Sequence, residues 1–263
     1  MAEADLKNDL VLVDRRGAVA HLTLNRPEQY NPLSFAMIRA LGAALQEVGK
    51  DPAVRVIVLG GTGKAFCAGH DLGEMVARPE RAFYEELFAA CSDLMMALPA
   101  LPQPVIARVH GTAAAAGCQL VGMCDLAIAS DKARFAVSGI AYGLFCSTPS
   151  VALVRNMPRK PAMEMLLTGD FIDAATAVAL GLINRAVPAD RLDDEIAALC
   201  AKIISKPAIS IARGKQLFYA QSEQPMKAAY RLAEQVMADN MMDAEAREGF
   251  CAFLEKRPPS WRQ

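Results

Sequence analysis

The sequence predicts an α/β protein with a helical C-terminal region, and three observations support this. Runs of β-branched and other apolar residues alternate with helical periodicity through the first half of the chain. After about residue 148, helical periodicity continues with few strand signals. The composition, 53% hydrophobic and 22% charged over 263 residues, is that of a globular protein with a sizeable core. The length suits one large domain, or one domain with an extension.

The first elements are read from turn residues and periodicity. Leu10–Val13 and Ala18–Leu24 are expected to pair as a hairpin around the turn at Arg15–Gly17. A helix is expected from Ser34, because the apolar residues that follow recur at helical spacing. Asp51 and Pro52 end this helix.

Buried strands and helices then alternate. Val54–Leu59 and Val105–Val109 are dense β-branched runs, which is typical of strands covered on both faces. A long amphipathic helix is expected between them, around Arg81–Leu98. Gln119–Met123 is expected to form a short helix and Asp125–Ala129 the next strand.

The last third reads as a series of helices. They are expected near 161–168, 173–180, 190–205, 207–222, 225–240 and 243–255. We therefore predict a core over residues 1–200 and a helical C-terminal region over residues 201–263. That region either caps the core or forms oligomers.

Charge and cysteine usage exclude several classes of protein. The net charge of −1 gives no reason to expect nucleic-acid binding, and no apolar run approaches the roughly 20 residues of a membrane span. The first residues lack a targeting pattern, so a cytoplasmic location is expected. The seven cysteines are odd in number and scattered, which favours reduced thiols. There is no CxxC pair and the three histidines are far apart, so no metal site is expected.

Three common motifs are absent. Residues 60–64 resemble part of a phosphate-binding loop, but Val58 stands where the first glycine is needed and Ala65 where magnesium needs a hydroxyl. There is no GxSxG elbow of a serine hydrolase. GxGxxG is absent as well, so a nicotinamide-binding fingerprint is missing.

Two loops rich in Gly and Ala remain as candidates for chemistry. AFCAGHDL (65–72) and GTAAAAGCQLVGMCD (111–125) each follow a predicted buried strand, where ligands of open α/β sheets usually bind. The second loop runs into a predicted helix, whose first amides have no intrahelical acceptor. Two amides aimed at one oxygen would stabilise an enolate or a tetrahedral oxyanion. The alternative is that the small residues only allow tight packing.

The ordered motifs of the chain resemble those of the crotonase, or enoyl-CoA hydratase/isomerase, superfamily. They are LNRPEQYNPLS, VRVIVLGGTGKAFCAGHDL, PVIARVHGTAAAAGCQLVGMCDLAIASDKARFAV, LTGDFIDAATAVALGLINRAV and the terminal FLEKRPPSW, so the resemblance covers nearly the whole chain. It implies a crotonase-like spiral of ββα units. It also implies C-terminal helices that support a homotrimer, or a hexamer formed from two trimers.

The resemblance implies an oxyanion hole for an acyl-CoA thioester. The two N–H groups would come from His70, which precedes Asp71 in AGHD, and from Ala116, three positions before Gln119. Because these are backbone groups, alanine in place of the family's usual glycine at position 116 matters less than the backbone conformation there.

The same resemblance implies residues that bind coenzyme A. Arg26 and Lys64 are candidates for phosphate contacts, beside the backbone at Ala68 and His70. Lys256 or Arg257 would reach the coenzyme A of a neighbouring subunit. For each of these charged side chains, a solvated surface role is the alternative. No cofactor is expected beyond the coenzyme A moiety of the substrate.

The sequence departs from the family at both positions of its acid–base pair. Hydratases of this family activate water with two glutamates, and the corresponding residues are Gln119 and Gly139. Neither is a general base at neutral pH, and such a base contributes roughly 10²–10⁴-fold to the rate. The His70 imidazole is the best substitute by position, because it adjoins the hole and titrates near neutrality. Ser138, Tyr142, Cys146 and Ser147 fall on the segment expected to line the acyl pocket.

Three functions stay open on the sequence. The first is an acyl-CoA lyase of the enoyl-CoA hydratase type with atypical acid–base chemistry. The second is a decarboxylase of a malonyl-type thioester, because loss of CO₂ forms the enolate without proton abstraction. AGHD without the catalytic glutamates is similar to methylmalonyl-CoA decarboxylases, although the pocket tyrosine of those enzymes falls near Cys146. The third is a protein that binds acyl-CoA without catalysis.

Overall fold

The main sheet of the protein is built from the buried β-branched runs. We describe residues 10–262 of a computed structural model. The strand order is β1-β2-β3-β5-β7-β10; β1 and β2 form an antiparallel hairpin and the other neighbours are parallel. The bounds are β1 Val11–Arg16, β2 Val19–Leu24, β3 Val56–Gly61, β5 Val105–Val109, β7 Leu126–Ser130 and β10 Arg185–Val187.

A second, smaller sheet runs beside the candidate site. Its order is β4-β6-β8-β9, formed by β4 Ala65–Cys67, β6 Thr112–Ala114, β8 Arg134–Ala136 and β9 Ile172–Asp173. Strand β4 lies in the first glycine- and alanine-rich loop and β6 in the second. Because β4 pairs with β6 in parallel, the two loops lie side by side.

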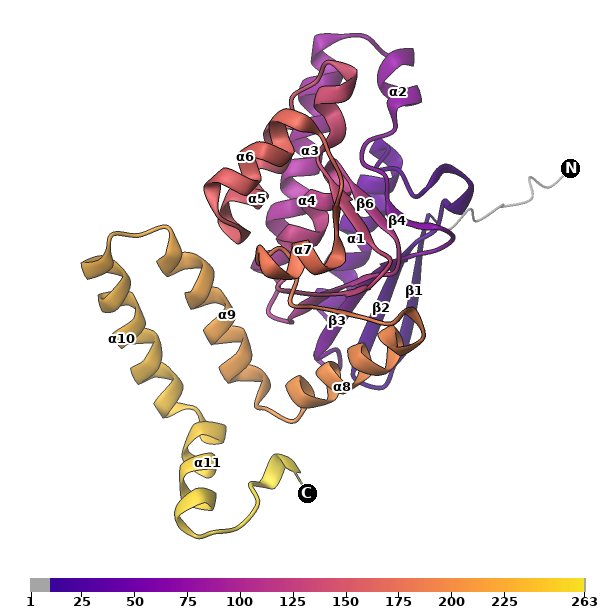
Figure 1. The fold of residues 1–263 in the computed structure, drawn as a ribbon. Coiled ribbons are helices and arrows are strands. Elements are labelled where there is room, and N and C mark those ends of the chain that lie inside the picture. The colour runs from indigo at the N-terminus through magenta and orange to yellow at the C-terminus, as the bar shows by residue number, and fades with distance from the viewer. Residues whose placement is uncertain (1–9, 263) are drawn as a thin grey trace, which may run out of the picture.

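The helices have the following bounds: α1 Phe35–Gly49, α2 Leu72–Ala77, α3 Arg81–Ala100, α4 Ala116–Met123, α5 Ser147–Asn156, α6 Arg159–Thr168, α7 Ala174–Ala179, α8 Leu192–Ile204, α9 Ala208–Ser222, α10 Met226–Met242 and α11 Ala244–Leu254. The predicted α/β fold with a helical C-terminal region is confirmed (Figure 1). None of the helices in the described residues is long and apolar enough to cross a membrane.

Side-chain alternation along the strands gives the main sheet two covered faces. Leu22, Leu59 and Ala107 point to the larger core, which also contains the apolar stripes of α1, α3 and α4. Val58 and Ile106 point to the opposite face, where α8 covers them. Two buried faces explain why β3, β5 and β7 are apolar almost throughout.

Helix α1 shows how local sequence sets an element. Ser34 caps it, because its side chain accepts a hydrogen bond from the Met37 N–H at 3.2 Å. Its apolar residues at helical spacing are all buried against the sheet: Met37, Ile38, Leu41, Ala44, Leu45 and Val48.

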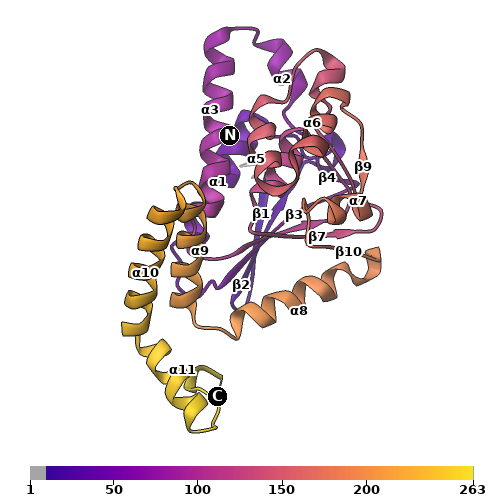
Figure 2. The same cartoon turned by 60° about the vertical axis from the view of Figure 1, so that its left-hand side comes forward.

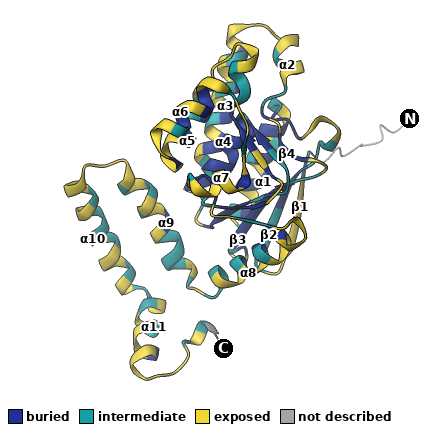
Figure 3. Ribbon diagram, viewed as in Figure 1, coloured by how far each residue is buried: buried dark blue, intermediate teal, exposed yellow. Residues whose placement is uncertain are grey.

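The last three helices, α9 to α11, form an arm that leaves the core (Figures 1 and 2). No residue of α10 is buried, and Figure 3 shows the arm mostly as exposed and intermediate. The arm exposes large apolar side chains: Phe218, Met226, Tyr230, Met237, Met242, Phe250, Phe253 and Leu254. The predicted division at residue 200 falls inside α8, which packs on the sheet, and α9 begins at Ala208.

One buried lysine ties the arm to the core. Lys215 of α9 donates hydrogen bonds to the carbonyl oxygens of Leu98 and Gln103, at 2.8 and 2.9 Å. Its ammonium also lies 2.7 Å from the Asp125 carboxylate, which in turn accepts hydrogen bonds from Tyr219 and from the Val105 N–H. Burial lowers the pKa of Lys215, although the Asp125 charge opposes this. Asp125 is therefore a structural residue.

Candidate active site

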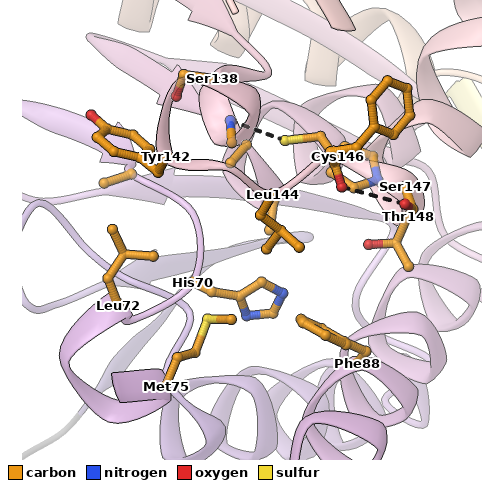
Figure 4. A pocket seen from close by; sticks show the side chains of 16 residues that line it. His70, Leu72, Met75, Phe88, Ser138, Tyr142, Leu144, Cys146, Ser147 and Thr148 are labelled. Atoms are coloured by element: carbon orange, nitrogen blue, oxygen red, sulfur yellow. Dashed lines mark hydrogen bonds between the residues drawn. The ribbon is translucent and has the colours of Figure 1, made fainter. Parts of the chain in front are cut away.

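The two Gly/Ala-rich loops and the segment at 138–149 enclose one cavity of about 250 Å³ (Figure 4). Its lining is Ala68, His70, Leu72, Met75, Phe88, Ala115, Ala116, Ser138, Gly139, Tyr142, Leu144, Phe145, Cys146, Ser147, Thr148 and Pro149. Three of the predicted positions, His70, Ala116 and Gly139, thus share one cavity with Ala68. Among the described residues that line it, none is Asp, Glu, Lys or Arg.

The backbone before His70 lies against the start of α4. Gly69 has φ +101°, and a β-carbon there would lie 3.4 Å from the Ala116 nitrogen and 2.9 Å from the Ala115 β-carbon. Glycine at 69 therefore permits both the left-handed backbone and the close approach of the two loops. This approach brings His70 and Ala116 to the same cavity.

Ala116 is the first residue of α4, so its N–H has no intrahelical acceptor. The preceding Ala115 has φ 48° and ψ −118°, an uncommon conformation for a residue with a side chain. The Ala115 N–H is bonded to the Ala136 carbonyl at 2.9 Å, which holds the turn in place. The α4 N-terminus adds a positive partial charge beside the cavity.

The His70 ring is fixed in one orientation. Its Nδ1–H donates to the Leu33 carbonyl oxygen at 3.1 Å, and its edge meets the Phe88 ring at a centroid distance of 5.5 Å. Because a carbonyl only accepts, the neutral ring carries its lone pair on Nε2, which is buried without a partner. Burial lowers the pKa of His70, although the bond to Leu33 opposes this. The imidazole is therefore neutral at pH 7.

Gln119 and Gly139, the two positions that the family resemblance assigns to the acid–base pair, have different surroundings. Gln119 is 4% exposed and its Oε1 is buried without a hydrogen-bond partner; it does not line the cavity. Gly139 does line the cavity, but a β-carbon there would lie 2.5 Å from the Leu144 carbonyl oxygen and 2.8 Å from the Cys146 sulfur. The chain itself thus fills the space that a side chain at 139 would need.

Arg26 and Lys64 lie on two loops held together by Asn31. The Asn31 amide donates to the carbonyls of Thr62 and Ala65 at 2.9 and 2.8 Å, and its Oδ1 accepts from the Arg26 N–H at 2.8 Å. The Lys64 residue is exposed and the Arg26 residue half-buried. Arg26 and Lys64 therefore lie on linked loops, and the loop of Lys64 continues to Ala68 in the cavity wall.

Lys256 and Arg257 are not brought to this cavity within one chain. They follow α11 at the far end of the arm (Figures 1 and 2). The Arg257 guanidinium is paired with Glu248 at 2.7 Å and with Glu255 at 2.6 Å, and these contacts raise its pKa. Their predicted contact with coenzyme A would need a neighbouring subunit.

Sequence reasoning missed Phe88 as a cavity residue and the contact between Cys146 and Gly139. Phe88 lies on α3, whose periodicity marks it only as part of a packed stripe. The contact at Gly139 arises because the chain turns back at Gly143, which has φ 84°. Gly143, which follows the 3₁₀ segment Ser138–Tyr142, is the signal in the sequence for this turn, because glycine readily adopts a positive φ.

Comparison with known proteins identifies the family. The model of the enoyl-CoA hydratase/isomerase family matches residues 14–263. The mitochondrial enoyl-CoA hydratase domain-containing protein 3 of Xenopus laevis is 42% identical over 252 residues, which cover 96% of this chain and 86% of that protein.

Solved structures agree with this result. A crystal structure of an enoyl-CoA hydratase from Mycobacterium smegmatis has a TM-score of 0.95 at 58% identity, covering 97% of this chain and 99% of that one. The structure of human enoyl-CoA hydratase domain-containing protein 3 has a TM-score of 0.93 at 41% identity, covering 96% and 100%. These neighbours confirm the predicted crotonase-like fold. The chain belongs to the enoyl-CoA hydratase/isomerase family.

Proposed function

We propose that the protein binds an acyl-CoA thioester with its carbonyl oxygen between the N–H groups of His70 and Ala116. We further propose that it acts as an acyl-CoA lyase whose acid–base chemistry does not use paired glutamates. One observation carries this proposal: Gly69 brings the backbone of the AGHD loop against the Ala116 nitrogen at the wall of a single cavity. Donors placed in this way act where negative charge develops on the thioester oxygen.

Decarboxylation of a malonyl-type thioester is the second candidate, and the lining of the cavity favours it. No carboxylate among the described lining residues is available to remove a proton. Loss of CO₂ breaks a carbon–carbon bond and leaves its electron pair on the enolate, so no base is needed. The negative charge moves from a poorly solvated carboxylate to the thioester oxygen, where hydrogen bonds from the two amides stabilise it and assist the step.

The coenzyme A moiety is proposed to lie along the loops of Arg26 and Lys64, beside the backbone of Ala68. The Arg26 guanidinium donates a hydrogen bond to Gln29 at 2.9 Å, and neither Arg26 nor Lys64 forms a salt bridge within the described residues, so both positive charges suit phosphates. The apolar side chains exposed on the arm are proposed to pack against other copies of the chain in a homotrimer or hexamer, because an isolated helix gains most of its stability from packing. In that assembly Lys256 or Arg257 would meet a neighbour's coenzyme A.

The vertebrate relatives are mitochondrial by name, and the cytoplasmic location of this chain stays a prediction.

A panel of thioesters tests the proposed function. Purified protein is incubated with crotonyl-CoA, malonyl-CoA, methylmalonyl-CoA and saturated acyl-CoAs, and turnover and affinity are measured together. We expect binding of the thioesters and turnover of at least one, with CO₂ release if the second candidate is correct. Tight binding without any turnover would identify the non-catalytic binding protein instead.

Two further outcomes would contradict specific parts of the proposal. Absence of binding by every thioester would refute the oxyanion hole. Hydration of crotonyl-CoA at ordinary enzymatic rates, retained in the variant Gln119→Ala, would show that a complete acid–base pair exists elsewhere in the cavity.

A further inference from the structure

The sulfur of Cys146 lies where a side chain at position 139 would begin. An ideal β-carbon on Gly139 would be 2.8 Å from this Sγ atom, so the thiol fills the space next to the Gly139 backbone. Cys146 directly precedes α5, is 7% exposed and lines the same cavity as His70 (Figure 4). Ala116 lines this cavity as well. The chain has thus placed a proton-bearing group at the second position of the missing pair.

The hydrogen bonds of Cys146 leave its proton available. The Gly139 N–H donates to the sulfur at 3.3 Å, so the sulfur acts as an acceptor in this contact. Within residues 10–262 the S–H hydrogen itself has no acceptor. Burial raises the pKa of Cys146, although the bond from Gly139 opposes this, so the thiol keeps its proton at neutral pH.

Other titratable groups near the cavity are poorer proton donors. The His70 ring is neutral and its only hydrogen is held by the Leu33 carbonyl, so Nε2 has none to give. Cys118 of α4 lies beside Cys146, but it is fully enclosed by the core and burial raises its pKa to about 12. Tyr142 also lines the cavity, but the residue is 75% exposed, so solvent competes for its hydroxyl.

We propose that Cys146 is the acid–base residue of this site and exchanges a proton with the α-carbon of the bound thioester. This rests on the proposed function, because it requires the enolate held by His70 and Ala116. When the enolate is protonated, the S–H bond breaks, its proton forms a C–H bond with the enolate electron pair, and the thioester carbonyl is restored. The thiolate left behind then takes a proton from water. In the reverse direction the thiolate removes the α-proton.

Hydrogen exchange at C2 of propionyl-CoA in D₂O tests this step, because it requires neither hydration nor loss of CO₂. We expect the wild-type protein to exchange the C2 hydrogens, as followed by mass spectrometry or NMR, and the rate to rise with pH as the thiol ionises. In Cys146→Ser the shape is nearly kept, but a hydroxyl is a far weaker acid, so the rate should fall about 10²–10⁴-fold. The increase of the exchange rate with pH should also disappear in this variant. Cys251→Ala, at the exposed cysteine of α11, is the matched control and should exchange like the wild type.

Each outcome separates this inference from the proposed function. Exchange lost in Ala116→Pro but retained in Cys146→Ser would leave the oxyanion hole intact and refute the role of Cys146. Wild-type protein that binds propionyl-CoA without any exchange would also refute it, because a group that protonates the α-carbon must deprotonate it in reverse. In that case, release of CO₂ from methylmalonyl-CoA would show that the proposed function holds without the role of Cys146. A Cys146→Ser variant that binds propionyl-CoA with wild-type affinity shows that the loss is chemical and not structural.

Discussion

Replacing Ala116 by proline should lower turnover of the preferred thioester by about 10²–10³-fold while the protein still folds. Ala116 is the first residue of α4, and proline is well tolerated at that position of a helix because no intrahelical hydrogen bond is lost. The substitution therefore removes one proposed donor of the oxyanion hole and no hydrogen bond of the helix. It also constrains Ala115, whose φ of 48° and ψ of −118° lie outside the conformation that proline favours in its predecessor.

A second proline at an equivalent position provides the control. Ala244 is the first residue of α11, and the Asp243 before it has φ −66° and ψ 143°, the extended conformation that proline favours in its predecessor. Ala244→Pro should keep wild-type turnover. Thermal midpoints of both variants report whether the strained Ala115 turn has been disturbed. Wild-type turnover by a folded Ala116→Pro protein would mean that this amide does not act on the substrate.

Replacing Lys215 by methionine should cost about 3–5 kcal/mol of the free energy of unfolding. The variant leaves the buried carboxylate of Asp125 without its cation and the carbonyls of Leu98 and Gln103 without their donor. The expected cost is therefore that of an uncompensated buried charge, not only that of a lost ion pair.

Urea denaturation at fixed protein concentration measures this effect. Lys202→Met, at an exposed lysine in the last turn of α8, is the matched control and should change the free energy by no more than about 0.5 kcal/mol. The double variant Asp125→Asn, Lys215→Met should recover part of the loss, because it removes the unpaired charge. A loss below about 1 kcal/mol in Lys215→Met would show that the arm does not depend on this anchor.

Long, periodic elements of the fold were predictable from the sequence. The strand expected at Val105–Val109 has those bounds, and the helix expected from Ser34 is capped by that residue. The six C-terminal helices also lie where their periodicity placed them. In each case a repeated apolar pattern reports burial on a defined face.

Short elements were not predictable, for the same reason. Strands β4, β6 and β8 have three residues each, which is too few for alternation to appear in the sequence. Helix α5 at Ser147–Asn156 mixes hydroxyl, proline and apolar residues near its start and shows no clear stripe. These elements are formed by their tertiary neighbours, and the strands pair only because longer strands have brought them together.

The candidate site was predictable as two loops but not as an arrangement. Small residues marked the AGHD loop and the tract before Gln119, and the structure brings His70 and Ala116 to one cavity. The family resemblance also predicted Gly139 at the position of a carboxylate. It did not show that the sulfur of Cys146 takes the adjacent space, since that contact depends on the turn at Gly143.

The carbonyl stretch of bound [1-¹³C]butyryl-CoA tests the oxyanion hole most directly. Two N–H groups that donate to one carbonyl oxygen weaken its double bond, so infrared difference spectra of the wild-type complex should show the band at lower frequency than in free butyryl-CoA. In Ala116→Pro the band should move back toward the free value. If butyryl-CoA binds and its carbonyl band stays at the solution frequency in the wild-type protein, the thioester oxygen does not lie between the amides of His70 and Ala116.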